Sequence, residues 1–349
     1  MKLKKSTINN IISYGIVIIA FIICQSMISA GVMKRSLRGQ MIPICVYIVM
    51  AVSLNLVVGI SGELSLGHAG FMSVGAFSAI IASAWIHAAL GVENEIVRLV
   101  LSMIVGGVFA GIAGVLIGIP VLRLRGDYLA IVTLAFGEII RNVLNCLYFS
   151  LDGSRLHVSF NNPNIPGTIL VNGPAGAASV DKIATFPVGF VLILFSLFVV
   201  LNLINSRSGR AIMATRDNRI AAEAMGINVT KYKMMAFVTS AVLAGMAGAL
   251  YGLNFSTVAA SKFKFDTSIL VLVFVVLGGI GNIWGSIIAA ALLTVLPELL
   301  RAFSDYRMLV YAIVLILVML ATNNPIIRSL FDRLIHRRRS AAQRGGASE

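Results

Sequence analysis

Apolar runs of about twenty residues recur along this chain of 349 residues, separated by short polar stretches. A helix of about twenty apolar residues spans the hydrocarbon core of a bilayer, where the backbone must satisfy its own hydrogen bonds. Charged residues make up 12% of the sequence, against about 25% in soluble domains. We therefore predict an all-α polytopic membrane protein, with a single transmembrane domain over residues 1–349.

The pattern predicts about ten membrane helices, the first a retained helix rather than a cleaved signal peptide. Ten spans place both termini on one side, and the positive-inside rule makes that side cytoplasmic, because most basic residues, including those of the tail 323–349, fall there. The basic cluster 34–38 is an exception. The predicted helices lie at 11–30, 41–60, 71–90, 98–120, 128–149, 186–205, 234–253, 267–283, 286–302 and 307–322.

The net charge of +14 does not indicate nucleic-acid binding, because the basic residues stand at the ends of apolar runs and act there as topology signals. Cys24, Cys45 and Cys146 lie inside apolar runs and form no CxxC pair. We therefore expect neither a disulfide framework nor a metal site.

A polar island, residues 206–233, stands between two apolar runs and is predicted to be cytoplasmic. Asp217 or Asn218 can cap a short helix that begins at Arg219, and Gly226 suits its end. The helix either docks on a partner protein or lies on anionic lipid, which the basic residues of the island would also favour. Its apolar face would hold Ile220, Ala224 and Ile227.

Two glycine-rich segments, 59–70 and 278–285, interrupt apolar stretches. Irregular backbone at membrane depth is tolerated only where it is buried in protein or lines a watery cavity, as in transporters, and the alternative is a simple loop at the interface. Neither segment matches a nucleotide-binding motif, so any ATP that drives this protein binds another chain. The candidate path or broken-helix residues here are Gly62, Glu63, Gly67, His68, Gly279 and Gly281.

Glu138 and Arg141 lie three residues apart inside one predicted span and share a helix face. Isolated charges in lipid are costly, so we expect them to pair and face the protein interior, as a structural ion pair or as part of a substrate path. Gly245, Gly248 and Gly252 recur near helical spacing and favour close helix packing.

The segment 150–185 is the one long loop predicted outside the membrane, and its Asn, Pro and Gly dipeptides mark turns. It is either a passive linker or a docking surface for an external partner.

Several stretches together resemble the LivM-type permease subunits of branched-chain amino acid ABC importers. The resemblance covers about residues 41–322 and is less specific for the substrate than for the family. The stretches are Leu54–Gly59, Gly62–Ala69, Arg125–Leu134 with Glu138–Asn142, Asn172–Pro174, Ala221–Gly226, and Gly278–Gly281 with Trp284–Gly285.

This resemblance implies a permease in the bacterial plasma (inner) membrane that imports leucine, isoleucine and valine and catalyses no reaction itself. It implies two ABC ATPase subunits that bind the ATP, a second related permease and an extracytoplasmic binding protein, with no cofactor on this chain. The residues that would couple to the ATPases are Arg219, Ala221, Ala222, Glu223 and Gly226.

Two alternatives remain at this point. A permease of the same class could carry urea, short amides, sugars or nucleosides. An ion-coupled secondary transporter would need ionisable groups along its path, and here only Glu138 and Arg141 lie clearly inside a span. No nucleophile–base set or metal cluster indicates an enzyme.

Overall fold

The computed structural model describes residues 5–31, 35–124, 126–153, 155–162, 166–178, 180–300, 306, 309–313 and 315–316. The chain divides into two compact units, residues 1–294 and 295–349, and the features below belong to the first. Most of the predicted helix 307–322 and the whole tail 323–349 lie outside the described residues. The single transmembrane domain therefore stays a prediction.

The first nine predicted helices each coincide with an observed helix, and their ends differ by a few residues. The polar island adds two short helices, α7 and α8. The bounds are α1 Lys5–Ser29, α2 Arg35–Asn55, α3 His68–Leu90, α4 Glu95–Val121, α5 Asp127–Asn145, α6 Phe186–Asn205, α7 Arg207–Asp217, α8 Arg219–Ala224, α9 Val229–Gly252, α10 Phe265–Gly278 and α11 Ile283–Leu299.

Within the described residues, five helical segments are long and apolar enough to cross a membrane. They are Ser36–Ser61, His68–Leu90, Glu95–Val121, Phe186–Asn205 and Val229–Gly252. The helices α10 and α11 are apolar but have 14 and 17 residues, fewer than the roughly 20 that a span needs. The chain is mostly helical, and the predicted count of about ten spans is not confirmed.

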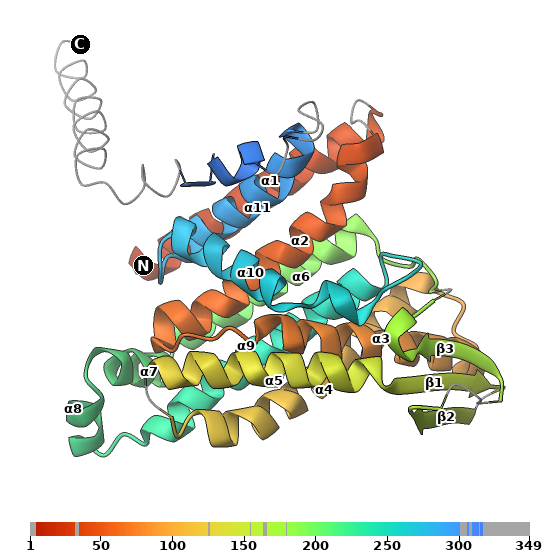
Figure 1. Ribbon diagram of the computed structural model, residues 1–349. Helices are drawn as coiled ribbons and strands as arrows, with labels where there is room; N and C mark the ends of the chain where they lie inside the picture. Colours follow the sequence, from red (N-terminus) through yellow and green to blue (C-terminus); the bar gives the residue numbers. More distant parts are fainter. Residues whose placement is uncertain are drawn as a thin grey trace, which may run out of the picture. The chain divides into compact units, whose positions relative to one another are not determined.

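The core is formed where α3, α4 and α9 cross, and glycines let the three backbones approach (Figure 1). A Cβ on Gly106 would lie 2.8 Å from the carbonyl oxygen of Gly75, and one on Gly245 would lie 2.8 Å from that of Gly106. Gly248 and Gly252 lie directly against the α3 backbone in the same way. The predicted close packing by the glycines of α9 is therefore confirmed, and it is the packing that membrane helices favour.

The expectation of an all-α fold is wrong between residues 147 and 172, where three strands form an antiparallel sheet in the order β2-β1-β3. The predicted helix 128–149 ends at Asn145 instead. The residues that follow are rich in aromatic and β-branched types, and Asp152 pairs with Arg155 across a tight turn, so a hairpin competes successfully with helix extension. The strands are β1 Leu147–Asp152, β2 Arg155–Phe160 and β3 Thr168–Asn172.

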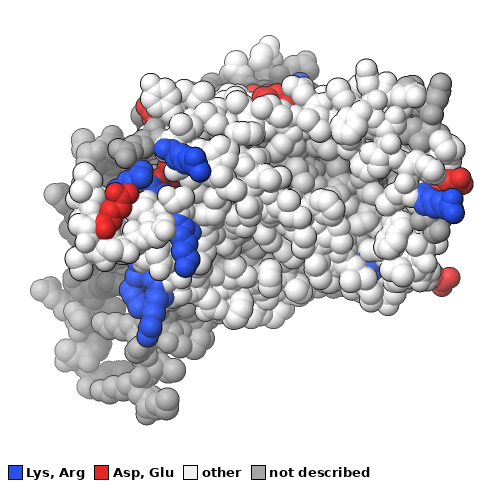
Figure 2. Space-filling model, turned by 90° about the horizontal axis from the view of Figure 1, so that it is seen from below, with Lys and Arg blue, Asp and Glu red and all other residues white. Residues whose placement is uncertain are grey.

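The sheet lies at one end of the helix bundle, and α7 and α8 lie at the other (Figure 1). Figure 2 shows that most Lys and Arg side chains of the visible face gather at the α7–α8 end, while the middle of this face is almost free of charge. Such a bare apolar belt between polar ends is what a bilayer requires.

The glycine contact in the core predicts a sharp difference between two Gly→Ala variants. Gly245→Ala should lower the stability of the detergent-solubilised protein by about 1–3 kcal/mol, because the new methyl group meets α4 directly. Gly39→Ala, in α2 with nothing within 4 Å, should be neutral or stabilising, because alanine favours helix by up to about 1 kcal/mol. Thermal denaturation followed by size-exclusion chromatography measures both, and equal stability of the two variants would contradict the packing.

Candidate functional site

The predicted docking helix exists as α8 and stands at the charged end of the bundle. The Asn218 side chain caps it by accepting a hydrogen bond from the Ala221 N–H at 3.0 Å, and Gly226 follows its end with a φ of 79°. Ile220 and Met225 are 81% and 82% exposed. An exposed apolar tip on a well-capped helix is typical of a surface that binds another protein.

One detail of α8 differs from the sequence-based expectation. Ile227 is only half-exposed, so the exposed apolar tip contains Met225 in its place. Glu223, one of the expected coupling residues, accepts a hydrogen bond from Arg219 at 2.9 Å, four residues earlier. This pairing is the usual one for opposite charges one turn apart on a helix. Ala221 is exposed and Ala222 is buried.

The first glycine-rich segment interrupts the helical path between α2 and α3. The helix α2 continues into a wider π-helical turn, η1 Leu56–Ser61, which ends at Gly62 with a φ of 76°. Residues 62–67 are then non-helical until α3 begins at His68. Such π-helical turns are rare and occur frequently at functional sites.

The break runs along α9. At its start Glu63 pairs with Lys233 of α9. At its end the His68 Nε2 lies 2.8 Å from the Ser53 hydroxyl, and the Ser240 hydroxyl of α9 donates to the Ser53 carbonyl at 2.6 Å. Seven residues separate Lys233 from Ser240, a rise of about 10 Å along a helix.

The ion pair between Glu63 and Lys233 is nearly buried, with side chains 13% and 10% exposed. The sequence singled out Glu63 and His68 but not Lys233, which is one of several basic residues in the island. His68 itself is 1% exposed and touches Ser53, so it braces the start of α3. Gly67 lies against the backbone of Thr133 in α5.

A second basic residue of the island reaches the same break. Arg216, near the end of α7, donates a hydrogen bond from Nη1 to the carbonyl oxygen of Gly59 at 2.8 Å. Its stem covers Gly62, where a Cβ would lie 2.5 Å from the Arg216 Cγ. Arg216 also pairs with the neighbouring Asp217 at 3.0 Å. The polar island is thus attached to the broken span by direct contacts.

The second glycine-rich segment meets the first. Between α10 and α11, Gly279 and Gly281 adopt φ values of 92° and 83°. The Gly281 N–H donates to the Asn55 side-chain oxygen at 2.9 Å, and the Asn55 amide donates to the Ser286 hydroxyl at 2.9 Å. A Cβ on Gly59 would lie 2.7 Å from the Gly281 Cα. Asn55 is fully buried and joins the two breaks, a role the sequence analysis did not assign.

Glu138 and Arg141 form the predicted ion pair on α5, at 2.7 Å. Their side chains are 32% and 22% exposed, so the pair lies at the surface of this chain rather than deep in its interior. The same helix exposes large apolar residues, including Tyr128 and Ile131. This mixed face suits contact with protein or water better than contact with lipid alone.

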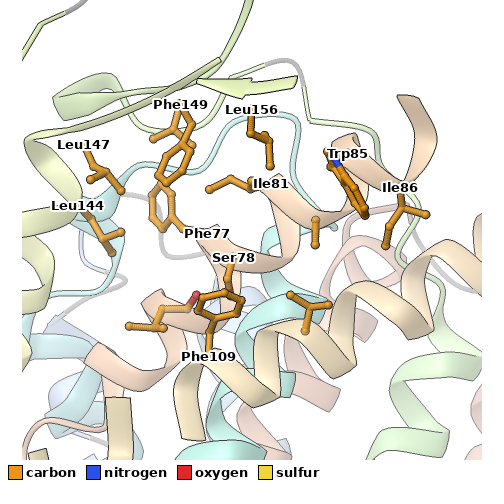
Figure 3. Close-up of a pocket in the computed structure, with 14 residues that line it drawn as sticks. Phe77, Ser78, Ile81, Trp85, Ile86, Phe109, Leu144, Leu147, Phe149 and Leu156 are labelled. Atoms are coloured by element: carbon orange, nitrogen blue, oxygen red, sulfur yellow. The ribbon is translucent and has the colours of Figure 1, made fainter. Parts of the chain in front are cut away.

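A cavity of about 480 Å³ lies between α3, α4 and the sheet (Figure 3). Figure 3 shows Phe77, Ile81 and Phe109 of the helices directed toward Phe149 and Leu156 of the strands. The lining is apolar apart from the indole of Trp85 and the hydroxyl of Ser78, which donates to the Val74 carbonyl at 2.6 Å. It offers no charged group to hold an ammonium or a carboxylate.

Within the described residues, no cluster of three or more His, Cys, Asp or Glu could hold a metal ion.

A charged hollow lies at the sheet end of the bundle. The buried Arg98 of α4 pairs with the exposed Asp181 at 3.2 Å. Lys182 and acidic residues at the start of α4 line the same hollow, of about 440 Å³. Asp181 and Lys182 belong to the loop predicted outside the membrane.

The bridge between the breaks predicts that Asn55→Leu destabilises the protein by about 1–3 kcal/mol, because the partly buried Gly281 N–H loses its partner. The matched control is Asn205→Leu, at an exposed helix end where water replaces the lost hydrogen bond. Thermal denaturation in detergent compares them. Two variants of equal stability would show that Asn55 does not join the breaks.

Comparison with known proteins assigns the chain to a family. Residues 39–319 match the family described as "Branched-chain amino acid transport system / permease component". The chain is 34% identical over 309 residues to the high-affinity branched-chain amino acid transport system permease protein LivM of Escherichia coli and of Salmonella typhimurium, an alignment that covers 79% of this chain and 66% of each relative. The chain thus spans slightly less than two thirds of the length of these relatives.

A more distant relative extends the comparison. The ribose import permease protein RbsC of Escherichia coli is 29% identical over 287 residues, covering 79% of this chain and 81% of the relative. No solved structure gives a significant match. The family match covers most of the residues that form the spans, both breaks and α8. The chain is a multi-pass membrane protein and belongs to the family of permease components of branched-chain amino acid transport systems.

Proposed function

We propose that this chain is a permease subunit of an ATP-driven ABC importer that moves branched-chain amino acids into the cell. One observation carries the proposal beyond family membership: a capped helix with an exposed apolar tip, α8, is attached to two broken spans inside the bundle. A transporter driven by a separate ATPase needs such an element, because a docked partner can act on the path only through direct contacts.

The proposed complex contains two ABC ATPase subunits, a second related permease and an extracytoplasmic binding protein. ATP binds the ATPases, and this chain binds no cofactor. The α8 tip inserts into a groove of an ATPase through Ile220 and Met225, while Arg219, Ala221, Ala222, Glu223 and Gly226 shape the helix and its end. ATP binding moves α8, and the spans alternate between two packed arrangements.

The charge distribution supports a membrane orientation. The α7–α8 end holds most Lys and Arg side chains of the face in Figure 2, so we place it in the cytoplasm of a bacterial cell and the sheet in the periplasm. Both termini are proposed to be cytoplasmic as well, as the pattern of ten spans predicts. The hollow around Arg98 and Asp181 then faces outward and offers charges of both signs to the binding protein.

The face of α5 that carries Glu138 and Arg141 is the proposed wall of the translocation path, completed by the second permease. Its exposed apolar residues suit the side chains of leucine, isoleucine and valine, and the ion pair keeps the wall neutral. Gly62, Glu63, Gly67, His68, Gly279 and Gly281 lie in or beside the two breaks, and we assign them to gating of this path. The buried His68 and Gly67 contribute as bracing residues.

A second candidate is a sugar permease of the same class, because the relative RbsC, named as a ribose import permease protein, matches over 79% of this chain. The two candidates predict different ligands for the cognate binding protein. Calorimetry of the cognate binding protein with leucine and with ribose decides between them, and binding of ribose alone would reject the amino-acid assignment.

The assembly is tested by purifying the full chain from mild detergent and identifying its partners by mass spectrometry. We expect two ATPase subunits and a second permease. Recovery of the chain alone, under conditions that preserve known importers, would favour an ion-coupled transporter.

The docking helix predicts two variants that insert normally but lose the ATPase. Met225→Asp places a charge in the apolar tip, and Gly226→Asp strains a left-handed residue at the helix end. The matched control is Gly91→Asp, which has a φ of 61° and open space around it in the turn between α3 and α4. Co-purification and leucine uptake in proteoliposomes measure the outcome. Normal uptake by both tip variants would exclude α8 as the docking element.

A further inference from the structure

We propose that Arg216 and Lys233 are positioning residues that carry the movement of the docking helix to the broken span. The inference rests on the proposed function and concerns how its coupling works. Arg216 precedes α8 in the sequence and Lys233 follows it, yet both hold the same short stretch, Gly59–Glu63. The docking helix is therefore attached to one break from both of its sides.

The Arg216 contact is specific to the irregular backbone. The Gly59 carbonyl lies in η1 and accepts the guanidinium hydrogen bond at 2.8 Å. The stem of Arg216 can cover Gly62 only because Gly62 has no Cβ. A charged donor on a backbone carbonyl gives a stronger hydrogen bond than a neutral one. Any displacement of α7 must therefore move the end of η1 or break this bond.

The Lys233 contact holds the next residue of the break. Lys233 and Glu63 are nearly buried, so separating them leaves two charges without compensation. Lys233 is in the second turn of α9, which begins within the island at Val229. The pair fixes the start of the extended segment to the same end of the bundle that carries α8.

The contacts continue to the second break. Gly59 lies against Gly281, and Asn55 accepts from the Gly281 N–H while donating to Ser286. The side-chain oxygen of Asn55 lies between the two glycine backbones, where a Cβ on Gly59 would clash with it. A shift of η1 must therefore displace residues 279–282, and both breaks respond to one movement of α7 and α8.

Two hydroxyls in the first break lack a partner among the residues that the structure describes, which fits a segment with a second arrangement. Ser61 and Ser65 are buried, and within the described residues their hydroxyls have no hydrogen-bond partner. Buried polar groups without partners are rare in folded proteins and need an explanation. A rearrangement of residues 61–67 would give these hydroxyls new partners, as expected of a segment that alternates between two states.

The test uses the complete importer in lipid nanodiscs and proteoliposomes. Arg216→Met keeps the stem over Gly62 and removes the donors, and Lys233→Met removes the ammonium. Arg210→Met is the control in α7, where Arg210 bonds only weakly to the Asn205 carbonyl at an exposed position. Lys231→Met is the control at the start of α9, where residue 231 is exposed.

Four quantities are compared with those of the wild-type complex. The first three are the amount of co-purified ATPase, the rate of leucine uptake, and the stimulation of ATP hydrolysis by the loaded binding protein. The fourth is thiol labelling of Leu64→Cys with and without a non-hydrolysable ATP analogue. Leu64 is an exposed residue of the break. The labelling background carries Cys146→Ser, because Cys146 is an exposed free cysteine.

We expect Arg216→Met and Lys233→Met to retain the ATPases while uptake falls about five- to hundred-fold, the usual range of coupling between sites. ATP hydrolysis should lose its response to the binding protein, and labelling of Leu64→Cys should lose its response to nucleotide. Both controls should behave as wild type. A merely structural role would instead remove the ATPases from the complex, and that result would overturn the proposal.

A charge exchange gives a second, independent test of the Lys233 contact. The double variant Glu63→Lys with Lys233→Glu restores an ion pair, and its uptake should exceed that of either single variant. No gain over the single variants would overturn the proposal for Lys233. If the wild-type chain neither binds ATPases nor imports leucine, the proposed function fails. If it does both and the variants match the controls, only the coupling role fails.

Discussion

Breaking a helix inside a membrane frees backbone groups that lipid cannot satisfy, and the arrangement of this protein depends on how neighbouring helices satisfy them. The Gly59 carbonyl is bonded by Arg216 and the Gly281 N–H by Asn55. The Leu66 N–H donates to Thr133 of α5 at 3.1 Å, and the Ala69 N–H donates to Ser268 of α10 at 3.0 Å. These hydrogen bonds connect the breaks to several helices, so the geometry of the breaks depends on the positions of those helices.

Glycine makes these contacts possible twice over. In the core, Gly75, Gly106 and Gly245 bring three helices close enough for backbone contact, which gives rigid packing. At the breaks, Gly59 leaves room for Gly281 and for the side chain of Asn55, and Gly62 leaves room for Arg216. The first group makes a stiff frame. The glycines at the breaks allow a small displacement of one segment to move the next. A transporter whose ATPase is a separate subunit requires such a connection.

The sequence predicted well wherever the signal is local. Helix positions follow from apolar length, α8 follows from the Asn218 cap and Gly226, and the Glu138–Arg141 pair follows from spacing on one helix. It failed at the sheet, because the short apolar run at 147–149 reads as the end of a helix as readily as a strand. The Asp152–Gly153 turn was the available signal for a hairpin.

The sequence by itself determined a membrane protein with two glycine-rich interruptions and a capped polar helix, because span length, glycine content and capping act over a few residues. Only the tertiary structure decided which charges and amides meet. Lys233 pairs with Glu63 from 170 residues away, and Asn55 reaches Gly281 across 226 residues. From the sequence alone, any of several basic residues of the island could have been the partner of the first break. The packing of α9 and α7 against the break selects Lys233 and Arg216, since only these two are brought within reach of its buried polar groups.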